Sequence, residues 1–355
     1  MRPLKYLPED QWPAADRAAF EAAFMPGDLF DEMRGPGAHL AEGSRRSIQT
    51  GYRRWLGFLE ANHPVDLLRR PADRISVERV RDFIAHLSLE MRPTSAAVTV
   101  QNLCYAARLI VPDRDWQWLC AIKARLLARA RPEDRFHRLV PPRQTLDFGV
   151  ELMDHALTLP ITSRKTREVQ YRDGLLLALL SLWPIRRRSL AALTVRRHIE
   201  IDDGGINILL HPVDTKSKRF ESFRVPEPLV PYVKRYLKDI RPRLLGDHVH
   251  DGFWASYHQR PLGPGRLYCI ARARLMKRFG KDMCLHDFRR SAATHLAMDA
   301  PEQLGLIPGL LQHTSADISE RHYNLANAIK ASQRFAAHRA ETKSKLQLLV
   351  KEPRA

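Results

Sequence analysis

The sequence predicts a mostly α-helical protein (α+β) with one small antiparallel β-sheet. Apolar residues recur at spacings of three and four through most of the chain, which is typical of amphipathic helices. One stretch near His198 changes to short runs of strand-forming residues separated by turn residues. The length of 355 residues exceeds what one hydrophobic core usually contains, so we expect two domains.

Four helical patterns predict a small helical domain over residues 41–133. They cover SIQTGYRRWLGFLEAN, SVERVRDFIAHLSLEM, SAAVTVQNLCYAARLI and DWQWLCAIKARLLARA. Residues 1–40 hold a short acidic helix pattern from Pro13 to Phe24 and then a Gly/Pro-rich break, so we expect a lead-in there. Residues 134–143 are charged and proline-bearing without periodicity, which is typical of a linker.

The second domain is expected over residues 144–355. Helical patterns from Leu146 to Leu159 and from Arg167 to Leu182 open it, and HIEI, INILLHP and FESFRVP then predict three short strands. The chain afterwards returns to helix, ending in a helical tail from Ala326 to Leu349. The apolar stretch from Gly174 to Trp183 is too short to span a membrane, so it predicts a buried helix.

The charge balance points to a polyanionic partner. The chain carries 58 Lys and Arg against 40 Asp and Glu, a net charge of +18, and such a field attracts nucleic acid first and anionic membranes second. Arginines also interrupt the apolar positions of the first domain, which suits a helical face on phosphates and equally suits a solvated surface. The N-terminus shows no apolar signal core and no long apolar span follows, so we expect a cytoplasmic protein without a membrane partner.

The cysteines indicate neither a metal site nor a disulfide framework. Cys104, Cys120, Cys269 and Cys284 form no CxxC pair and lie inside apolar patterns. Reduced thiols in the core are therefore expected, and no metal or other cofactor.

Two basic side chains of the second domain suit work on a phosphate. Arg186 follows the end of a helix. After it, Leu190 and Leu193 lie three residues apart, the apolar spacing of a new helix. An arginine at such a junction can donate two hydrogen bonds to one phosphate. A solvent-exposed cluster of arginines without a ligand is the simpler explanation of these residues. Lys216 lies in the turn between the second and third strands, where it can donate a proton to a substrate or only keep the turn soluble.

Further along, His286 and Arg289 lie three residues apart in a helical pattern and can converge on one anion. Metal binding is opposed there by the adjacent arginines. Thr314 or Ser315 can cap a new helix, which places His313 just before that helix and Tyr323 on it. A phenol becomes a nucleophile only where neighbouring groups help it to lose its proton.

This order of residues resembles the tyrosine recombinase or phage integrase family. The resemblance covers essentially the whole second domain, and the segment from about Arg45 to Pro132 is similar to the family's core-binding domain. It implies an integrase-type catalytic domain whose catalytic residues are Arg186, Lys216, His286, Arg289, His313 and Tyr323. We expect DNA contacts from Arg45, Arg46, Arg53, Arg54, Lys218, Arg219 and Arg290.

The resemblance also implies a mechanism. Tyr323 attacks a DNA phosphodiester and leaves a 3′-phosphotyrosine, while the two arginines and His313 stabilise the charge on phosphorus. His286 assists the tyrosine proton or holds the phosphate, and Lys216 protonates the departing 5′ oxygen. A second DNA hydroxyl reseals the strand without ATP or metal. Double-stranded DNA is the implied partner, bound by a homotetramer on paired sites.

Two departures from the family pattern matter. Ser189 stands where the family usually has Glu or Asp, so another carboxylate or a backbone carbonyl is expected to orient Arg186. Between His313 and Tyr323 lies one residue more than in the commonest spacing of the family. The alternatives are a type IB topoisomerase, which shares the chemistry but relaxes DNA as a monomer, and a DNA-binding regulator that has lost catalysis. An RNA-binding module would need an aromatic-rich strand motif that the sequence lacks.

Overall fold

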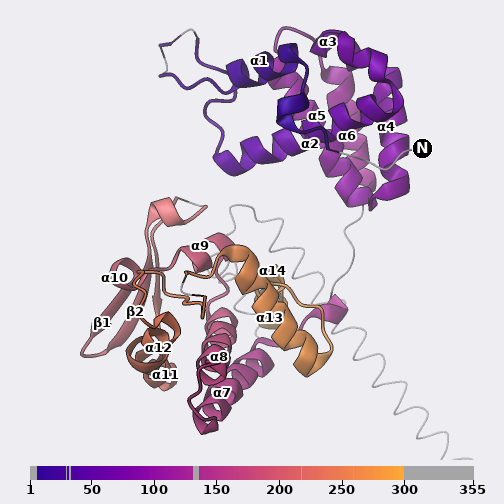
Figure 1. Cartoon of the computed structure of the whole chain (residues 1–355). Helices are drawn as coiled ribbons and strands as arrows, with labels where there is room; N and C mark the ends of the chain where they lie inside the picture. Colours follow the sequence, from indigo (N-terminus) through magenta and orange to yellow (C-terminus); the bar gives the residue numbers. More distant parts are fainter. Residues whose placement is uncertain are drawn as a thin grey trace, which may run out of the picture. The chain divides into compact units, whose positions relative to one another are not determined.

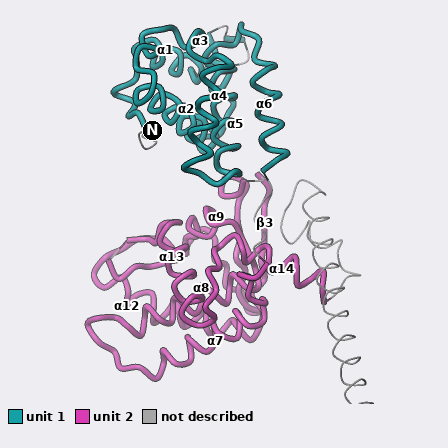
Figure 2. The backbone as a smooth tube through the Cα atoms, turned by 90° about the vertical axis from the view of Figure 1, so that its right-hand side faces the viewer, with its two compact units in different colours: residues 1–134 teal, residues 135–355 magenta. Residues whose placement is uncertain are grey.

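The computed structural model describes residues 6–28, 30–31, 33–130, 136–216, 218–258 and 260–299. These residues form mostly α-helices and one three-stranded antiparallel sheet, which confirms the predicted fold class. The chain divides into two compact units, residues 1–134 and residues 135–355 (Figure 2). No helix in the described ranges is both long enough and apolar enough to cross a membrane.

Unit 1 is helical throughout its regular structure (Figure 1). Its helices are α1 (Ala14–Ala23), α2 (Glu42–Asn62), α3 (Pro71–Arg74), α4 (Val77–Glu90), α5 (Pro93–Ile110) and α6 (Gln117–Arg129). Local sequence signals set several of the starts. The Ser76 side chain accepts a hydrogen bond from the Arg79 N–H and caps α4, and Pro93 takes the first position of α5.

The N-terminal segment is part of the core of unit 1. Leu7, Trp12 and Phe20 are buried together with α2 residues such as Trp55. Helices α2 and α5 approach closely because Gly51 has no side chain: a methyl group there would lie 2.4 Å from the Asn102 Cβ. The residues placed before the helical domain by their sequence pattern therefore pack into its interior.

Unit 2 begins with two long helices, and shorter elements surround them (Figure 1). Its helices are α7 (Pro142–Thr158), α8 (Thr166–Leu182), α9 (Arg187–Ala192), α10 (Val195–His198), α11 (Val230–Arg235), α12 (Arg241–Leu245), α13 (Pro264–Phe279) and α14 (Leu285–Asp299). A π-helical turn, Tyr236–Ile240, joins α11 to α12. Helix α7 starts within the range expected to be a linker, because Pro142 is suited to a first helical position.

The sheet of unit 2 is a meander of three short strands, β1 (Ile199–Asp202), β2 (Gly205–Leu210) and β3 (Glu221–Arg224). Ile208 of the central strand pairs with Ile199 on one side and with Phe223 on the other. Ile206, Ile208 and Leu210 are buried, as the two-residue period of a half-buried strand requires. The three predicted strands are thus present.

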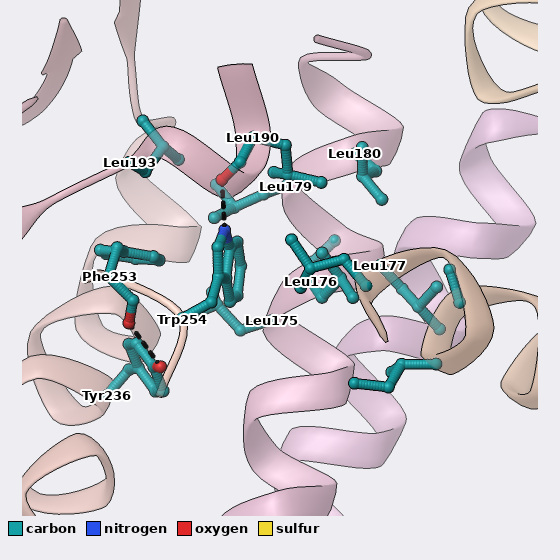
Figure 3. Packing of buried hydrophobic residues seen from close by; sticks show 14 of the residues in the cluster. Leu175, Leu176, Leu177, Leu179, Leu180, Leu190, Leu193, Tyr236, Phe253 and Trp254 are labelled. Atoms are coloured by element: carbon teal, nitrogen blue, oxygen red, sulfur yellow. Dashed lines mark hydrogen bonds between the residues drawn. The ribbon is translucent and has the colours of Figure 1, made fainter. Parts of the chain in front are cut away.

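Helix α8 passes through the centre of the core of unit 2. Its run from Leu175 to Leu180 is buried on every side, which confirms the buried helix predicted there. Part of this core is drawn in Figure 3, where the buried Trp254 donates its indole N–H to the carbonyl oxygen of Leu190, 2.9 Å away. The expectation of core thiols is wrong for Cys269, which is exposed on α13.

Candidate active site

Arg186 is positioned by the connection between α8 and α9. It is the residue that precedes the first turn of α9, in an extended backbone conformation. Leu190 and Leu193 follow it and are both buried, as the predicted register requires. The Trp183 ring stacks on Phe223 of β3 at a centroid distance of 5.1 Å and an interplanar angle of 5°. The core thus fixes the chain on both sides of Arg186.

Helix α14 carries His286 and Arg289 on its first turns. Arg289 is buried, and its guanidinium donates a hydrogen bond of 2.7 Å to the carbonyl oxygen of Pro184. Pro184 lies two residues before Arg186 in the chain. A residue of α14 therefore reaches the same connection that presents Arg186, although more than a hundred residues separate them in sequence.

The guanidinium of Arg289 is buried and lies near a second positive charge. Burial, together with the charge of Arg186, lowers its pKa to about 10, and the carboxylate of Glu221 opposes that shift. Arg289 remains cationic at neutral pH, since its pKa stays well above 7. A buried arginine that stays charged beside a second guanidinium forms a site suited to an anion.

His286 shares this environment. Its ring reaches the surface, yet the surrounding chain removes much of its hydration and so lowers its pKa below the usual 6.5. The charges of Arg289, Arg290 and Arg186 lower the pKa further, and Asp287 acts in the opposite direction. His286 is therefore neutral at pH 7 and can accept a proton. The charge of Arg186 thus acts on both His286 and Arg289, which come from another part of unit 2.

Lys216 lies on the turn between β2 and β3 and is exposed. The turn is closed by the buried Thr215, whose hydroxyl accepts a hydrogen bond from the Arg219 N–H (3.1 Å) and donates one to the Arg219 carbonyl oxygen (2.9 Å). Lys218 takes a positive φ of 52°. Among the contacts of the described residues, none joins Lys216 directly to Arg186 or Arg289.

Comparisons with known proteins give the family resemblance independent support. No family model matches the sequence. Tyrosine recombinase XerD of Chlorobaculum tepidum is 25% identical to this chain over 195 residues. Tyrosine recombinase XerD of Staphylococcus saprophyticus is 25% identical to it over 161 residues. The chain is similar to tyrosine recombinases. The matched segments cover 53% and 44% of this chain and 60% and 52% of the two relatives, so little more than half of each relative is matched.

Two solved recombinase structures also align with the chain. One is XerA recombinase, at 14% identity and a TM-score of 0.40, over 84% of this chain and 94% of that one. The other is XerH site-specific recombinase bound to its palindromic difH substrate, at 12% identity and a TM-score of 0.46, over 94% of this chain and 98% of that one.

Two of the residues suggested by the tyrosine recombinase pattern, His313 and Tyr323, lie outside the described residues. The residue that sequence reasoning missed is Glu221, a buried acid at the start of β3 whose negative charge acts on Arg289. The alternation of FESFRV does not by itself reveal which face of the strand points inward, so no signal in the sequence singled out this carboxylate.

Unit 1 carries an open groove between α2 and α5, with a volume of about 520 Å³. Arg46 and Arg54 line it from α2, since residues eight apart lie on one helical face. The Arg54 guanidinium donates a hydrogen bond to the Thr99 hydroxyl of α5 at 3.0 Å. Further polar lining residues are Ser47, Thr50, Thr94, Ser95 and Asn102. Cationic, hydroxyl and amide donors in one groove suit phosphates and base edges.

The other expected DNA contacts are placed differently. Arg45 lies over the Phe24 ring at 4.8 Å, and Arg53 donates a hydrogen bond of 3.3 Å to the Leu7 carbonyl oxygen, so both make contacts within unit 1. Lys218 and Arg219 are exposed on the Lys216 turn. The Arg290 side chain is 35% exposed, and its guanidinium lies 3.8 Å from the Asp287 carboxylate.

Proposed function

We propose that this chain is a site-specific tyrosine recombinase that cleaves and rejoins double-stranded DNA through a 3′-phosphotyrosine. The proposal rests on the charge of Arg186 acting on both His286 and Arg289, and on the hydrogen bond from Arg289 to Pro184 beside Arg186, in a chain similar to tyrosine recombinases. Preorganised positive groups around one point are what a doubly charged phosphorane-like state requires.

The roles follow from the charge state of each group. Arg186 and Arg289 keep their charge at neutral pH and bind the non-bridging oxygens of the phosphate. His286 is neutral and accepts the phenolic proton of Tyr323 or holds the phosphate. The phenolate oxygen bonds to phosphorus as the bond to the 5′ oxygen breaks, and Lys216 gives a proton to that oxygen. His313 adds a further donor to the phosphate.

DNA binding is assigned to both units. The +18 net charge favours a polyanion, and the groove of Arg46 and Arg54 offers unit 1 a surface for one. Lys218, Arg219 and Arg290 contribute phosphate contacts in unit 2. Strand exchange between two DNA sites requires four active sites, so the active form is a homotetramer. The phosphotyrosine retains the energy of the broken bond, so resealing needs neither ATP nor a metal.

The decisive variant is Tyr323→Phe. It removes one oxygen and leaves the ring, so the variant should fold and bind duplex DNA with unchanged affinity yet form no covalent adduct on a suicide substrate. The wild-type chain should form that adduct without added metal or nucleotide, and peptide mapping should locate it at Tyr323. An adduct with the Phe variant, or one mapped to any residue other than Tyr323, would refute the proposed active site.

The same preparations separate the alternatives. A type IB topoisomerase would relax any supercoiled plasmid, whereas a recombinase requires paired sites and exchanges strands between them. A regulator without catalysis would bind DNA and form no adduct even as the wild-type chain.

A further inference from the structure

A buried hydrogen bond joins helix α9 to the base of the Lys216 turn. The Ser189 hydroxyl donates to the carbonyl oxygen of Asp214 at 2.8 Å, and the Ser189 residue is only 4% exposed. Asp214 ends the 3₁₀ turn Pro212–Asp214 and precedes Lys216 by two residues. The serine that replaces the family's usual carboxylate therefore contacts the lysine turn.

The side chain of Asp214 is also held by hydrogen bonds. Its carboxylate accepts hydrogen bonds from Arg197 at 2.8 Å and from the Nε2 of His198 at 3.1 Å. The backbone N–H of Thr194 donates to the Nδ1 of His198 at 2.9 Å, so Nε2 carries the proton that Asp214 receives. His198 is only 1% exposed, which keeps water from competing for its own bond to Asp214.

The rest of the turn is closed on itself by Thr215, through its two hydrogen bonds to the backbone of Arg219. Lys216 therefore lies within this closed loop, two residues after the anchored Asp214. Its side chain is exposed, and the backbone that carries it is held by the hydrogen bonds of Asp214 and Thr215.

We infer that Ser189 is a positioning residue for Lys216, acting through the carbonyl group of Asp214. The role rests on the proposed DNA-cleaving function, in which Lys216 gives its proton to the departing 5′ oxygen. In a chain with Glu or Asp at this position, the carboxylate would accept hydrogen bonds and orient the arginine that corresponds to Arg186. The serine hydroxyl instead donates to a carbonyl group, and it couples the helix next to Arg186 to the general acid.

The test compares two suicide substrates that differ in one atom. In the first, the leaving group is the normal 5′ oxygen; in the second it is a 5′ bridging sulfur, which departs as a thiolate without receiving a proton. Ser189→Ala should cleave the oxygen substrate about fivefold more slowly, the change that corresponds to a hydrogen bond of about 1 kcal/mol. Its rate on the sulfur substrate should remain within twofold of the wild-type rate.

The ratio of the two rates is the quantity to measure. Both rates are divided by the folded fraction of each preparation, measured by circular dichroism, so partial unfolding of Ser189→Ala alters neither the corrected rates nor their ratio. Ser189→Thr keeps a hydroxyl group and should restore the wild-type ratio. Ser181→Ala is the matched control, because Ser181 also donates its hydroxyl to a backbone carbonyl, that of Leu177, at 2.8 Å. Its ratio should equal that of the wild type.

Equal losses on both substrates would overturn the inference, since they would mean that Ser189 acts through Arg186, whose charge is needed whichever atom departs. An unchanged rate on the oxygen substrate would overturn it as well. In either case the wild-type chain still forms its adduct. Absence of an adduct with the wild-type chain on both substrates is a different result, and it refutes the proposed function.

Discussion

The crossing of α7 and α8 depends on two facing glycines, and we predict that Gly149→Ala destabilises unit 2. A methyl group at Gly149 would lie 2.7 Å from the carbonyl oxygen of Gly174 and 2.8 Å from the nitrogen of Ala178. In the reverse direction, a methyl group at Gly174 would lie 2.5 Å from the carbonyl oxygen of Gly149. These are backbone atoms that cannot rotate away, so the two helices must separate.

The expected magnitude is a balance of two terms. Ordinary contact begins at 3.4 Å, so the helices must move apart by about 0.7 Å at Gly149. Forcing extra volume into a packed core costs about 1–3 kcal/mol. Alanine is a better helix former than glycine by about 1 kcal/mol. Because the clash is with backbone on both sides, we expect a net loss of about 1–2 kcal/mol, or roughly 2–8 °C in the unfolding temperature of this unit.

Differential scanning calorimetry of the full chain measures the effect. Gly265→Ala is the matched control, because Gly265 is also helical, on α13 in the same unit, and no atom lies within 4 Å of a methyl group there. That variant should be neutral or more stable by up to about 1 kcal/mol. The double variant Gly149→Ala/Gly174→Ala should lose less unfolding free energy than the sum of the two single losses. The same increase in the distance between the helices accommodates both methyl groups. If Gly149→Ala is as stable as Gly265→Ala, the reasoning is wrong.

Two further predictions concern buried charge. Arg74→Met should destabilise unit 1 by about 3–5 kcal/mol in urea unfolding, because it leaves the fully buried Asp16 carboxylate without the guanidinium that lies 3.0 Å away; a loss below 1 kcal/mol would contradict this. In the DNA-free chain, NMR titration of His286 should give a pKa below 6.5, so that the ring stays neutral until the pH falls below that value. Arg290→Gln should raise this pKa, and Arg290→Lys should not; a wild-type value at or above 6.5 would contradict the combined effect of burial and the nearby positive charges.

The pattern of the sequence alone determined the elements. Helices and strands follow from local periodicity, and the predicted register of Arg186 depended on Leu190 and Leu193, which are both buried. His286 and Arg289 were placed on one helical face by their spacing of three. The predictions of helices and strands succeed because each uses residues within a few turns of one another, where backbone geometry leaves few alternatives.

The partners of the site residues were decided only by the tertiary structure. Nothing local indicates that Arg289 binds the carbonyl oxygen of Pro184, that Glu221 acts on the same arginine, or that Ser189 donates to Asp214. Each of these pairs joins elements far apart in sequence, and many pairings would satisfy the same hydrophobic pattern. Which pairing forms depends on how α8, α14 and the sheet pack as a whole, because a buried polar group takes whatever partner that packing brings within reach.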